Sequence, residues 1–329
     1  MRPMIINHKI YGRFKVTEPV LIELIKSDSV QRLKKIDQLG AWHLHQDFNG
    51  LFSRYQHSIG VMLLLRKFNA GLEEQIAGLL HDISHTAFSH VTDFVFNSQD
   101  KQNYQDNKLI QAFEIQGVNK MLKKYGISPR KILTFENFPL LENELPDICA
   151  DRIDYTLQDP LGKEIFKNRT KDFLKHLTVY KGEFVFKDKT WAKKFAKLYL
   201  EISQKLWSGP KHIALFQVLS DAIRIALDKK IISEKDLFTT DDAVMKKLKK
   251  SGDFEILKKI KLLKSLKIKV VPKSRADICN HSKVRTVDPK FLSGNKLLRL
   301  TTMDKIYKKE METWRKKASK GFCMKILNK

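Results

Sequence analysis

Apolar residues recur every three or four positions along most of the chain, which is the spacing of helices that bury one face. This period covers residues 17–26, 29–39, 57–68, 72–80, 108–125, 145–159, 191–207 and 213–231. Strand-like alternation is confined to a few short stretches, at residues 7–14, 178–186, 268–271 and 322–326. The pattern predicts a mainly α-helical protein with minor β-hairpins.

Positive charge is concentrated in the last quarter of the chain. Residues 241–329 contain 26 of the 62 Lys and Arg residues but only 9 of the 37 Asp and Glu residues. Polar residues interrupt the helical pattern near residues 233–260, where the charge rises. We therefore expect a first domain at residues 1–240 and a small basic α+β C-terminal lobe at residues 241–329.

The basic lobe has two interpretations. It can bind nucleic acid or another acidic partner. Its lysines, however, are spread over helical faces and are not interleaved with aromatic residues, which favours a solvated surface without a nucleic-acid partner.

The composition is that of a folded globule, since 42% of the 329 residues are hydrophobic. Cys149, Cys279 and Cys323 are widely spaced and form no CxxC motif, so we expect a reducing compartment and neither a disulfide framework nor a zinc knuckle. No apolar run approaches the ~18 residues of a membrane span. The N-terminus also lacks the apolar core of a signal peptide. These features predict a soluble, cytoplasmic protein with no membrane contact.

The adjacent pair His81 and Asp82, at the end of an apolar helical run, is the most informative chemical signal in the chain. His57 opens the preceding apolar run, and Asp151 opens an acidic motif at residues 151–155. Two imidazoles and two carboxylates suit a divalent metal that supports hydrolysis. Neighbouring side chains on a helix point about 100° apart, so His81 and Asp82 can share an ion only if it lies beside the helix. We predict that these four residues meet at one ion.

Two further histidines follow the pair. His85 lies four residues after His81, so a continuing helix would turn both toward one ion, where His85 could contact a phosphate or pass a proton. A hydrogen-bonded core histidine is the alternative. His90 and Asp93 are three residues apart, a spacing that lets a carboxylate hold an imidazole in one tautomer, although a structural cap explains this pair equally well.

The order of these motifs resembles the HD-domain phosphohydrolases, and most closely their deoxynucleoside triphosphate triphosphohydrolase branch. That family has a lone His, then His-Asp, then a distant Asp, and the matching blocks here are residues 54–61, 78–90 and 150–159. Residues 30–40 resemble the substrate-side segment of the family, and residues 191–250 continue the resemblance more loosely. The resemblance implies an HD-type helical core and a homo-oligomer.

The resemblance also implies roles for individual residues. The implied metal ligands are His57, His81, Asp82 and Asp151, for a divalent ion that could be Fe, Mn, Mg, Ni or Zn. The implied catalytic residues are His85, at the phosphate under attack, with His90 and Asp93 supporting it. The implied substrate-binding residues are Arg54 and Arg152 at the polyphosphate and Gln38, Tyr155 and Asp159 at the sugar. Surface ion pairing is the alternative for the two arginines, and core packing or capping for the other three.

One position departs from the family pattern. The triphosphohydrolase branch has a histidine that helps to protonate the leaving group, and Gln105 stands in its place here. Glutamine cannot transfer a proton at neutral pH, and loss of one acid–base group typically lowers the rate about 10²- to 10⁴-fold.

We therefore expect a metal-dependent phosphohydrolase that cleaves a nucleotide phosphoester, first of all a deoxynucleoside triphosphate to deoxynucleoside and triphosphate. Two alternatives are a phosphodiesterase or nuclease that uses the same metal site on nucleic acid, and a catalytically weakened nucleotide or nucleic-acid binder.

Overall fold

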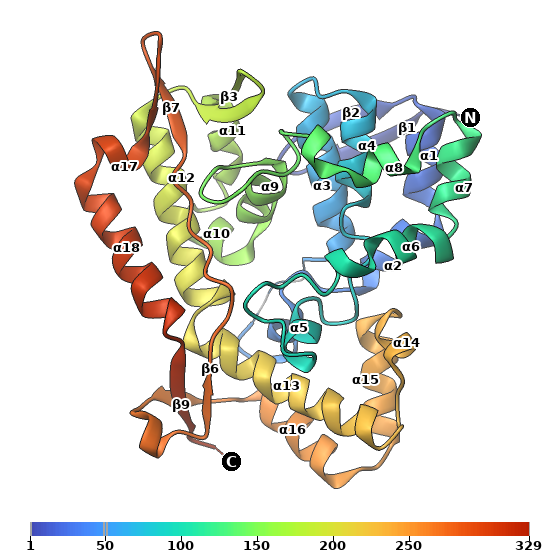
Figure 1. Cartoon of the computed structure of the whole chain (residues 1–329), viewed down its shortest axis with the longest axis vertical. Helices are drawn as coiled ribbons and strands as arrows, with labels where there is room; N and C mark the ends of the chain where they lie inside the picture. The colour runs from blue at the N-terminus through green and yellow to red at the C-terminus, as the bar shows by residue number, and fades with distance from the viewer. Residues whose placement is uncertain (1, 49, 51, 329) are drawn as a thin grey trace.

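A computed structural model describes residues 2–48, 50 and 52–328, and helices dominate it (Figure 1). The N-terminal elements are β1 (Met4–His8), β2 (Gly12–Val16), α1 (Pro19–Lys26), α2 (Asp28–Arg32), η1 (Leu33–Lys35), η2 (Gly40–Leu44), α3 (Arg54–Lys67), α4 (Leu72–Leu80) and α5 (Val91–Val95). The next elements are η3 (Asp106–Lys108), α6 (Leu109–Ile115), α7 (Val118–Lys124), α8 (Pro129–Leu133), η4 (Phe135–Asn137), α9 (Ala150–Gln158), α10 (Pro160–Ile165), η5 (Thr170–Asp172) and α11 (Phe173–His176).

The second half of the chain begins with a hairpin and two long helices. These are β3 (Leu177–Tyr180), β4 (Glu183–Phe186), α12 (Lys189–Ile202) and α13 (Pro210–Asp228), with a π-helical turn, η6 (Ser203–Trp207), between the helices. The remaining elements are α14 (Glu234–Leu237), α15 (Asp241–Lys250), α16 (Phe254–Lys264), β5 (Ile268–Val270), η7 (Lys273–Arg275), β6 (Ile278–Asn280), β7 (Lys290–Ser293), β8 (Lys296–Arg299), α17 (Leu300–Met303), α18 (Lys305–Ser319) and β9 (Phe322–Ile326).

Helix α3 is the centre of the core. Residues 57–65 of this helix are all buried, as expected for a helix that is apolar on every side. It begins at a capping box, in which Ser53 and Gln56 satisfy each other's backbone N–H groups. Helices α4 and α9 pack against α3, so the C-terminal end of α4 and the N-terminal end of α9 both come close to the first turns of α3.

The predicted fold class, mainly α with small β elements, is confirmed. The hairpins expected near residues 7–14 and 178–186 are present as β1–β2 and β3–β4. The helix expected at residues 108–125 is wrong in detail, because Gly117 adopts a left-handed φ of 71° and separates α6 from α7. The helix expected from residue 145 begins only at Ala150, and the one expected at residues 29–39 ends at Arg32.

The basic C-terminal lobe packs directly on the helices before it. Helix α16 packs against α13, and β7 pairs with β4 to complete a four-stranded sheet of order β3-β4-β7-β8 (Figure 1). The strands expected at residues 268–271 and 322–326 are β5 and β9, which meet β6 in the three-stranded sheet β5-β9-β6. The division into domains at residues 1–240 and 241–329 stays a prediction.

One expectation about cysteines is wrong. Cys279 in β6 and Cys323 in β9 face each other in the strand register and form a disulfide bond. They are 44 positions apart in the chain, so only the strand pairing reveals that they are neighbours. The argument for a reducing compartment loses this support. Among the described residues, no helix has both the length and the apolar character required to cross a membrane.

Gly40 offers a test of the packing around the core. Its φ is 60°, and an added Cβ would lie 2.6 Å from Phe88 O and 2.8 Å from Phe216 Cζ. Gly40→Ala should lower the free energy of unfolding by about 2–4 kcal/mol, from backbone strain and overpacking together. Gly71→Ala is the control, because nothing lies within 4 Å of its Cβ position and its φ is unstrained. Chemical denaturation measures both, and equal stability of the two variants would contradict this packing.

Candidate active site

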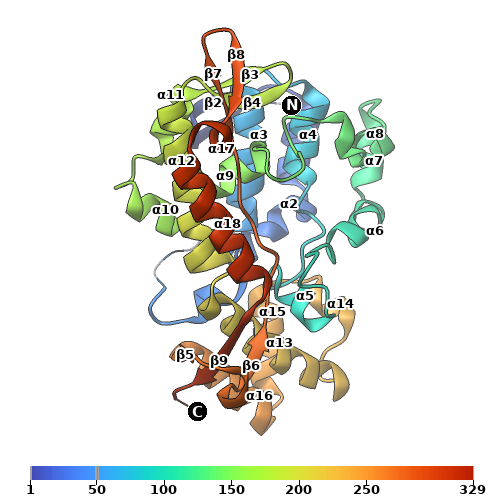
Figure 2. The same cartoon turned by 60° about the vertical axis from the view of Figure 1, so that its left-hand side comes forward.

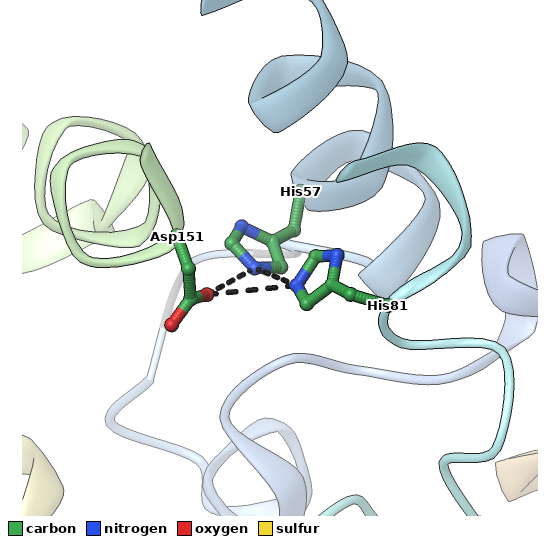
Figure 3. A group of neighbouring side chains, drawn as sticks. All are labelled: His57, His81 and Asp151. Carbon is green, nitrogen blue, oxygen red and sulfur yellow. Dashed lines mark hydrogen bonds and ion pairs between the residues drawn. The ribbon is translucent and has the colours of Figure 1, made fainter. Parts of the chain in front are cut away.

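Three helix ends bring three of the predicted ligands together (Figure 3). His57 Nε2 lies 2.9 Å from Asp151 Oδ1 and 3.2 Å from His81 Nε2, and His81 Nε2 lies 3.6 Å from the same carboxylate oxygen. His57 comes from the first turn of α3, His81 from the residue after α4, and Asp151 from the first turn of α9. These three atoms therefore surround one point, as ligands of a single ion must.

The hydrogen bonds of the two imidazoles fix which nitrogen faces this point. His57 Nδ1 donates to Asp154 Oδ2 at 2.7 Å, and His81 Nδ1 donates to the Gly78 carbonyl at 2.8 Å. In the neutral rings both Nε2 atoms therefore carry lone pairs, and these lone pairs point toward each other. A divalent cation between them resolves this conflict, so the residues fit a metal site.

The pKa values of the cluster also indicate that it stabilises a positive charge. Burial lowers the pKa of His57, but the hydrogen bonds to Asp151 and Asp154 outweigh it and raise that pKa to about 10. Burial raises the pKa of Asp151, yet the bonds to His57 and His81 leave it below its ordinary value. The cluster is therefore built to keep a positive charge among its carboxylates.

Asp154 is a site residue to which the sequence analysis assigned no role. It is fully buried, and it accepts hydrogen bonds from Tyr11 Oη at 2.5 Å and from Gln158 Nε2 at 2.9 Å besides that from His57. An added Cβ at Gly60 would lie 2.1 Å from its Oδ1, so only glycine leaves room for this carboxylate. The signal was available, because Asp154 lies three residues after Asp151 on the same side of α9.

Asp82 lies beside the three ligands and is paired with Arg54. Its Oδ2 accepts from Arg54 Nη1 at 2.8 Å, and its two oxygens lie 3.5 Å from His81 Nε2 and 3.8 Å from His57 Nε2. Burial raises the pKa of Asp82, but Arg54 and the neighbouring histidines hold it well below its ordinary value. Asp82 is thus a carboxylate within ligand reach of the cluster, held in place by an arginine.

His85 reaches the site by a different route from the one expected. Helix α4 ends at Leu80, and residues 81–90 form successive turns in which Phe88 has a φ of 60°, so the helix does not continue to His85. His85 Nε2 nevertheless lies 3.2 Å from Asp82 Oδ1, and its ring meets the ring of His90 edge-on at 5.1 Å. Burial and the charge of Arg54 lower the pKa of His85 to about 3, which keeps it neutral.

His90 is held by Asp93 as its spacing suggested. The distance from His90 Nδ1 to Asp93 Oδ2 is 3.0 Å, and Asp93 is fully buried. The bond occupies Nδ1 and leaves Nε2 of His90 for a substrate. Burial lowers the pKa of His90, although Asp93 opposes this shift.

A cavity of about 510 Å³ opens over the cluster. Ten of the predicted site residues line it, namely Gln38, Arg54, His81, Asp82, His85, His90, Asp151, Arg152, Tyr155 and Asp159, while His57 and Asp93 are fully buried and are not among the lining residues. The other lining residues include four that the sequence analysis missed: Trp207, His212, Lys283 and Arg285. They follow the recognised motifs at long distance along the chain, and no local pattern marks them.

The predicted substrate residues have protein partners of their own. Arg152 Nη2 lies 2.8 Å from Glu142, and Tyr155 Oη lies 2.5 Å from Tyr199 Oη. Asp159 caps α10 and also lines the cavity, and burial raises its pKa to about 7.

Two polar side chains of the cavity wall, Gln38 and His212, have unused hydrogen-bonding capacity. Gln38 Oε1 and His212 Nε2 are both buried without a hydrogen-bond partner among the described residues. His212 Nδ1 accepts from Trp42 Nε1 at 3.2 Å, so its Nε2 carries the proton of the neutral ring. Both side chains line the cavity, which leaves one acceptor and one donor available for a ligand.

Gln105 also lines the cavity, at the place where the family pattern has a histidine. Its Nε2 donates to the Gln102 carbonyl at 2.8 Å and to Asp106 at 3.2 Å. The amide is thus held by the protein, and it supplies no titrating group to the cavity.

A helical scaffold that holds two imidazoles and a carboxylate around one point is a candidate metal site of the kind that metal-dependent hydrolases use. The HD domain family matches residues 54–157. The uncharacterized protein YdhJ of Bacillus subtilis is 37% identical over 330 residues, covering 98% of this chain and 99% of that protein. The metal-dependent phosphohydrolase cns2 of Cordyceps militaris is 31% identical, covering 87% of this chain and 84% of that protein.

The chain belongs to the HD-domain family of metal-dependent phosphohydrolases, which confirms the resemblance drawn from the motifs. The deoxynucleoside triphosphate triphosphohydrolase SAMHD1 of Mus musculus is 30% identical over a match that spans 40% of this chain and 23% of that protein. The family is therefore one of metal-dependent phosphohydrolases, and the substrate is a separate question.

Asp154→Asn should weaken metal binding by about 10- to 100-fold, because a neutral amide no longer holds His57 in the required tautomer. Gly60→Ala should act in the same direction by displacing Asp154. Chelator competition with metal analysis measures the affinity. Asp172→Asn is the control, since Asp172 pairs with Arg169 and Lys175 and does not line the cavity. A folded Asp154→Asn protein with unchanged metal affinity would remove this role from Asp154.

Proposed function

We propose that the protein hydrolyses nucleotide phosphoesters, with a deoxynucleoside triphosphate as the first candidate substrate and deoxynucleoside and triphosphate as its products. In this proposal His57, His81, Asp82 and Asp151 hold the divalent ion. The observation that carries it is the cavity itself, which joins the ligand cluster to Arg54 and Arg152 on its wall and to a set of aromatic and polar side chains.

Each part of the cavity then has a chemical task. A divalent ion held by the cluster would supply Lewis acidity toward a phosphoryl oxygen and toward water. Arg54 and Arg152 offset the charge of the phosphates, for which a planar guanidinium is well suited. His85 would contact the phosphate under attack, and His90, with its Nδ1 held by Asp93, would take a proton from the attacking water at Nε2 and give it to the leaving oxygen.

The aromatic and polar part of the cavity wall suits a nucleoside. Tyr155 and Trp207 meet edge to face with ring centroids 4.9 Å apart and form one wall. Asp159 and the unpaired Gln38 Oε1 supply polar contacts for sugar hydroxyls. Similarity to a deoxynucleoside triphosphate triphosphohydrolase supports this substrate class, over 40% of the chain.

The alternatives differ in what the cavity receives. A phosphodiesterase or nuclease would use the same ligands on a nucleic acid held by the basic lobe, and its binding would weaken steeply with salt. A catalytically weakened protein would bind a nucleotide or nucleic acid in the cavity without hydrolysing it. Gln105, which stands in the place of the family histidine, agrees with this alternative. A cytoplasmic location and a homo-oligomer remain predictions.

The test is product identification from a panel of deoxynucleotides and ribonucleotides with the metal-loaded protein. We expect triphosphate and nucleoside as products, and no turnover with His81→Ala. His90→Asn should lower kcat by about 10²- to 10⁴-fold, because it removes a proton-transfer group. His176→Ala is the matched control, since His176 stacks on Trp191 and does not line the cavity.

A metal-loaded, folded protein that releases neither phosphate, triphosphate nor nucleoside from any member of the panel would contradict the proposal. Release of mononucleotides from a nucleic acid, with no release from free nucleotides, would replace it by the nuclease alternative. Circular dichroism of each variant shows that a loss of turnover is not a loss of folding.

A further inference from the structure

Residues 281–289, here called the strap, connect β6 to β7 as an extended segment without regular structure. Figure 2 shows it running along the molecule from the sheet that contains β6 and β9 to the sheet that contains β7 and β8. The strap is therefore the part of the C-terminal lobe that runs beside the cavity. Two of its side chains, Lys283 and Arg285, line that cavity.

Hydrogen bonds to separate parts of the chain hold the strap in place. Val287 is fully buried, and its carbonyl accepts from Tyr307 Oη at 2.6 Å. Three further bonds are those from Lys283 N to Gln99 O (3.1 Å), from Ser203 Oγ to Arg285 O (2.8 Å) and from Asp288 N to Pro146 O (2.8 Å). Because hydrogen bonds fix the backbone at Lys283 and Arg285, the two side chains leave the strap in fixed directions and are not free surface charges.

Lys283 and Arg285 are two positions apart, so in an extended segment their side chains leave the backbone on the same side. Both are half-buried, and neither forms an ion pair with any described residue. The other two cavity arginines are already compensated, since Arg54 pairs with Asp82 and Arg152 pairs with Glu142. The strap therefore contributes positive charge to the cavity that no ion pair with a described residue compensates.

The two cations lie near different parts of the site. Arg285 adds to burial in lowering the pKa of His90 and of His212, so it is within electrostatic reach of the proposed acid–base group. Burial lowers the pKa of Lys283 itself, with Arg285 adding to the shift and Asp106 and Glu142 opposing it. Both side chains therefore add positive charge to the cavity wall.

We propose that Lys283 and Arg285 bind the phosphate groups beyond the one attacked at the metal cluster, so that the C-terminal lobe sets the preference for a polyphosphate over a monophosphate. This inference rests on the proposed function for its substrate. The chemistry that suits the strap is a chain of phosphates, because an ammonium and a guanidinium side by side match oxygens carried on successive phosphorus atoms.

The test is calorimetric binding of inorganic triphosphate and of orthophosphate to the metal-loaded protein. Lys283→Gln and Arg285→Gln should each weaken triphosphate binding about tenfold or more, as expected for loss of a charged hydrogen bond, and should change orthophosphate binding much less. Arg285→Lys should recover part of the loss. Lys269→Gln and Lys296→Gln are matched controls, since both lysines are exposed on the same lobe and line no part of the cavity.

The outcomes separate this inference from the proposed function. Unchanged triphosphate affinity in both strap variants would overturn the inference, even in a protein that hydrolyses nucleotides. An equal loss for orthophosphate and triphosphate would also overturn it, because the strap would then act on the attacked phosphate. Selective loss of triphosphate binding, in a protein that turns over no nucleotide, would support the strap site and leave the proposed function contradicted.

Discussion

The site depends on two lone pairs that face each other. His57 Nε2 and His81 Nε2 are 3.2 Å apart, and both rings have committed their Nδ1 protons elsewhere. Neither nitrogen can satisfy the other, and Asp151 adds negative charge at the same point. Only a positive charge stabilises this arrangement. Much of the surrounding structure serves to maintain it: the N-terminal hairpin supplies Tyr11 to Asp154, and α3 has a glycine at position 60 where Asp154 approaches.

The sequence predicted those site residues that a short motif marks, and it did not predict those that only tertiary packing brings to the site. His57, His81 and Asp151 could be recognised because their residue types and order are unusual, although their convergence requires packing of α3, α4 and α9. Asp154 was equally accessible, since it lies three residues from Asp151 on one helix. His212, Lys283 and Arg285 could not be found in this way, because each reaches the cavity through tertiary packing and not through a spacing.

The errors in the fold prediction have the same physical origin. Helical periodicity continues through residues 108–125, but the left-handed Gly117 ends one helix and starts another. Strands β6, β7 and β8 contain three or four residues each, too few for an alternating pattern to stand out. Their partners are distant, as with β7 and β4, so the sheets and the Cys279–Cys323 bond follow from long-range pairing that no local window contains.

The strap changes how the basic lobe is understood. The distribution of lysines in the basic lobe suggested a solvated surface, and most of these lysines fit that description. Lys283 and Arg285 do not, because half-buried cations that form no ion pair with a described residue repel each other and lose hydration, which costs free energy in the folded state. A protein retains such a pair most easily where a ligand compensates it. An anion bound between the C-terminal lobe and the cluster would then stabilise the packing of the lobe on the N-terminal helices. A ligand that binds only the folded protein shifts the folding equilibrium toward the folded state. A cation relieves the lone-pair conflict at the cluster, an anion compensates the two cations of the strap, and a polyphosphate bound to a metal ion would satisfy both at once.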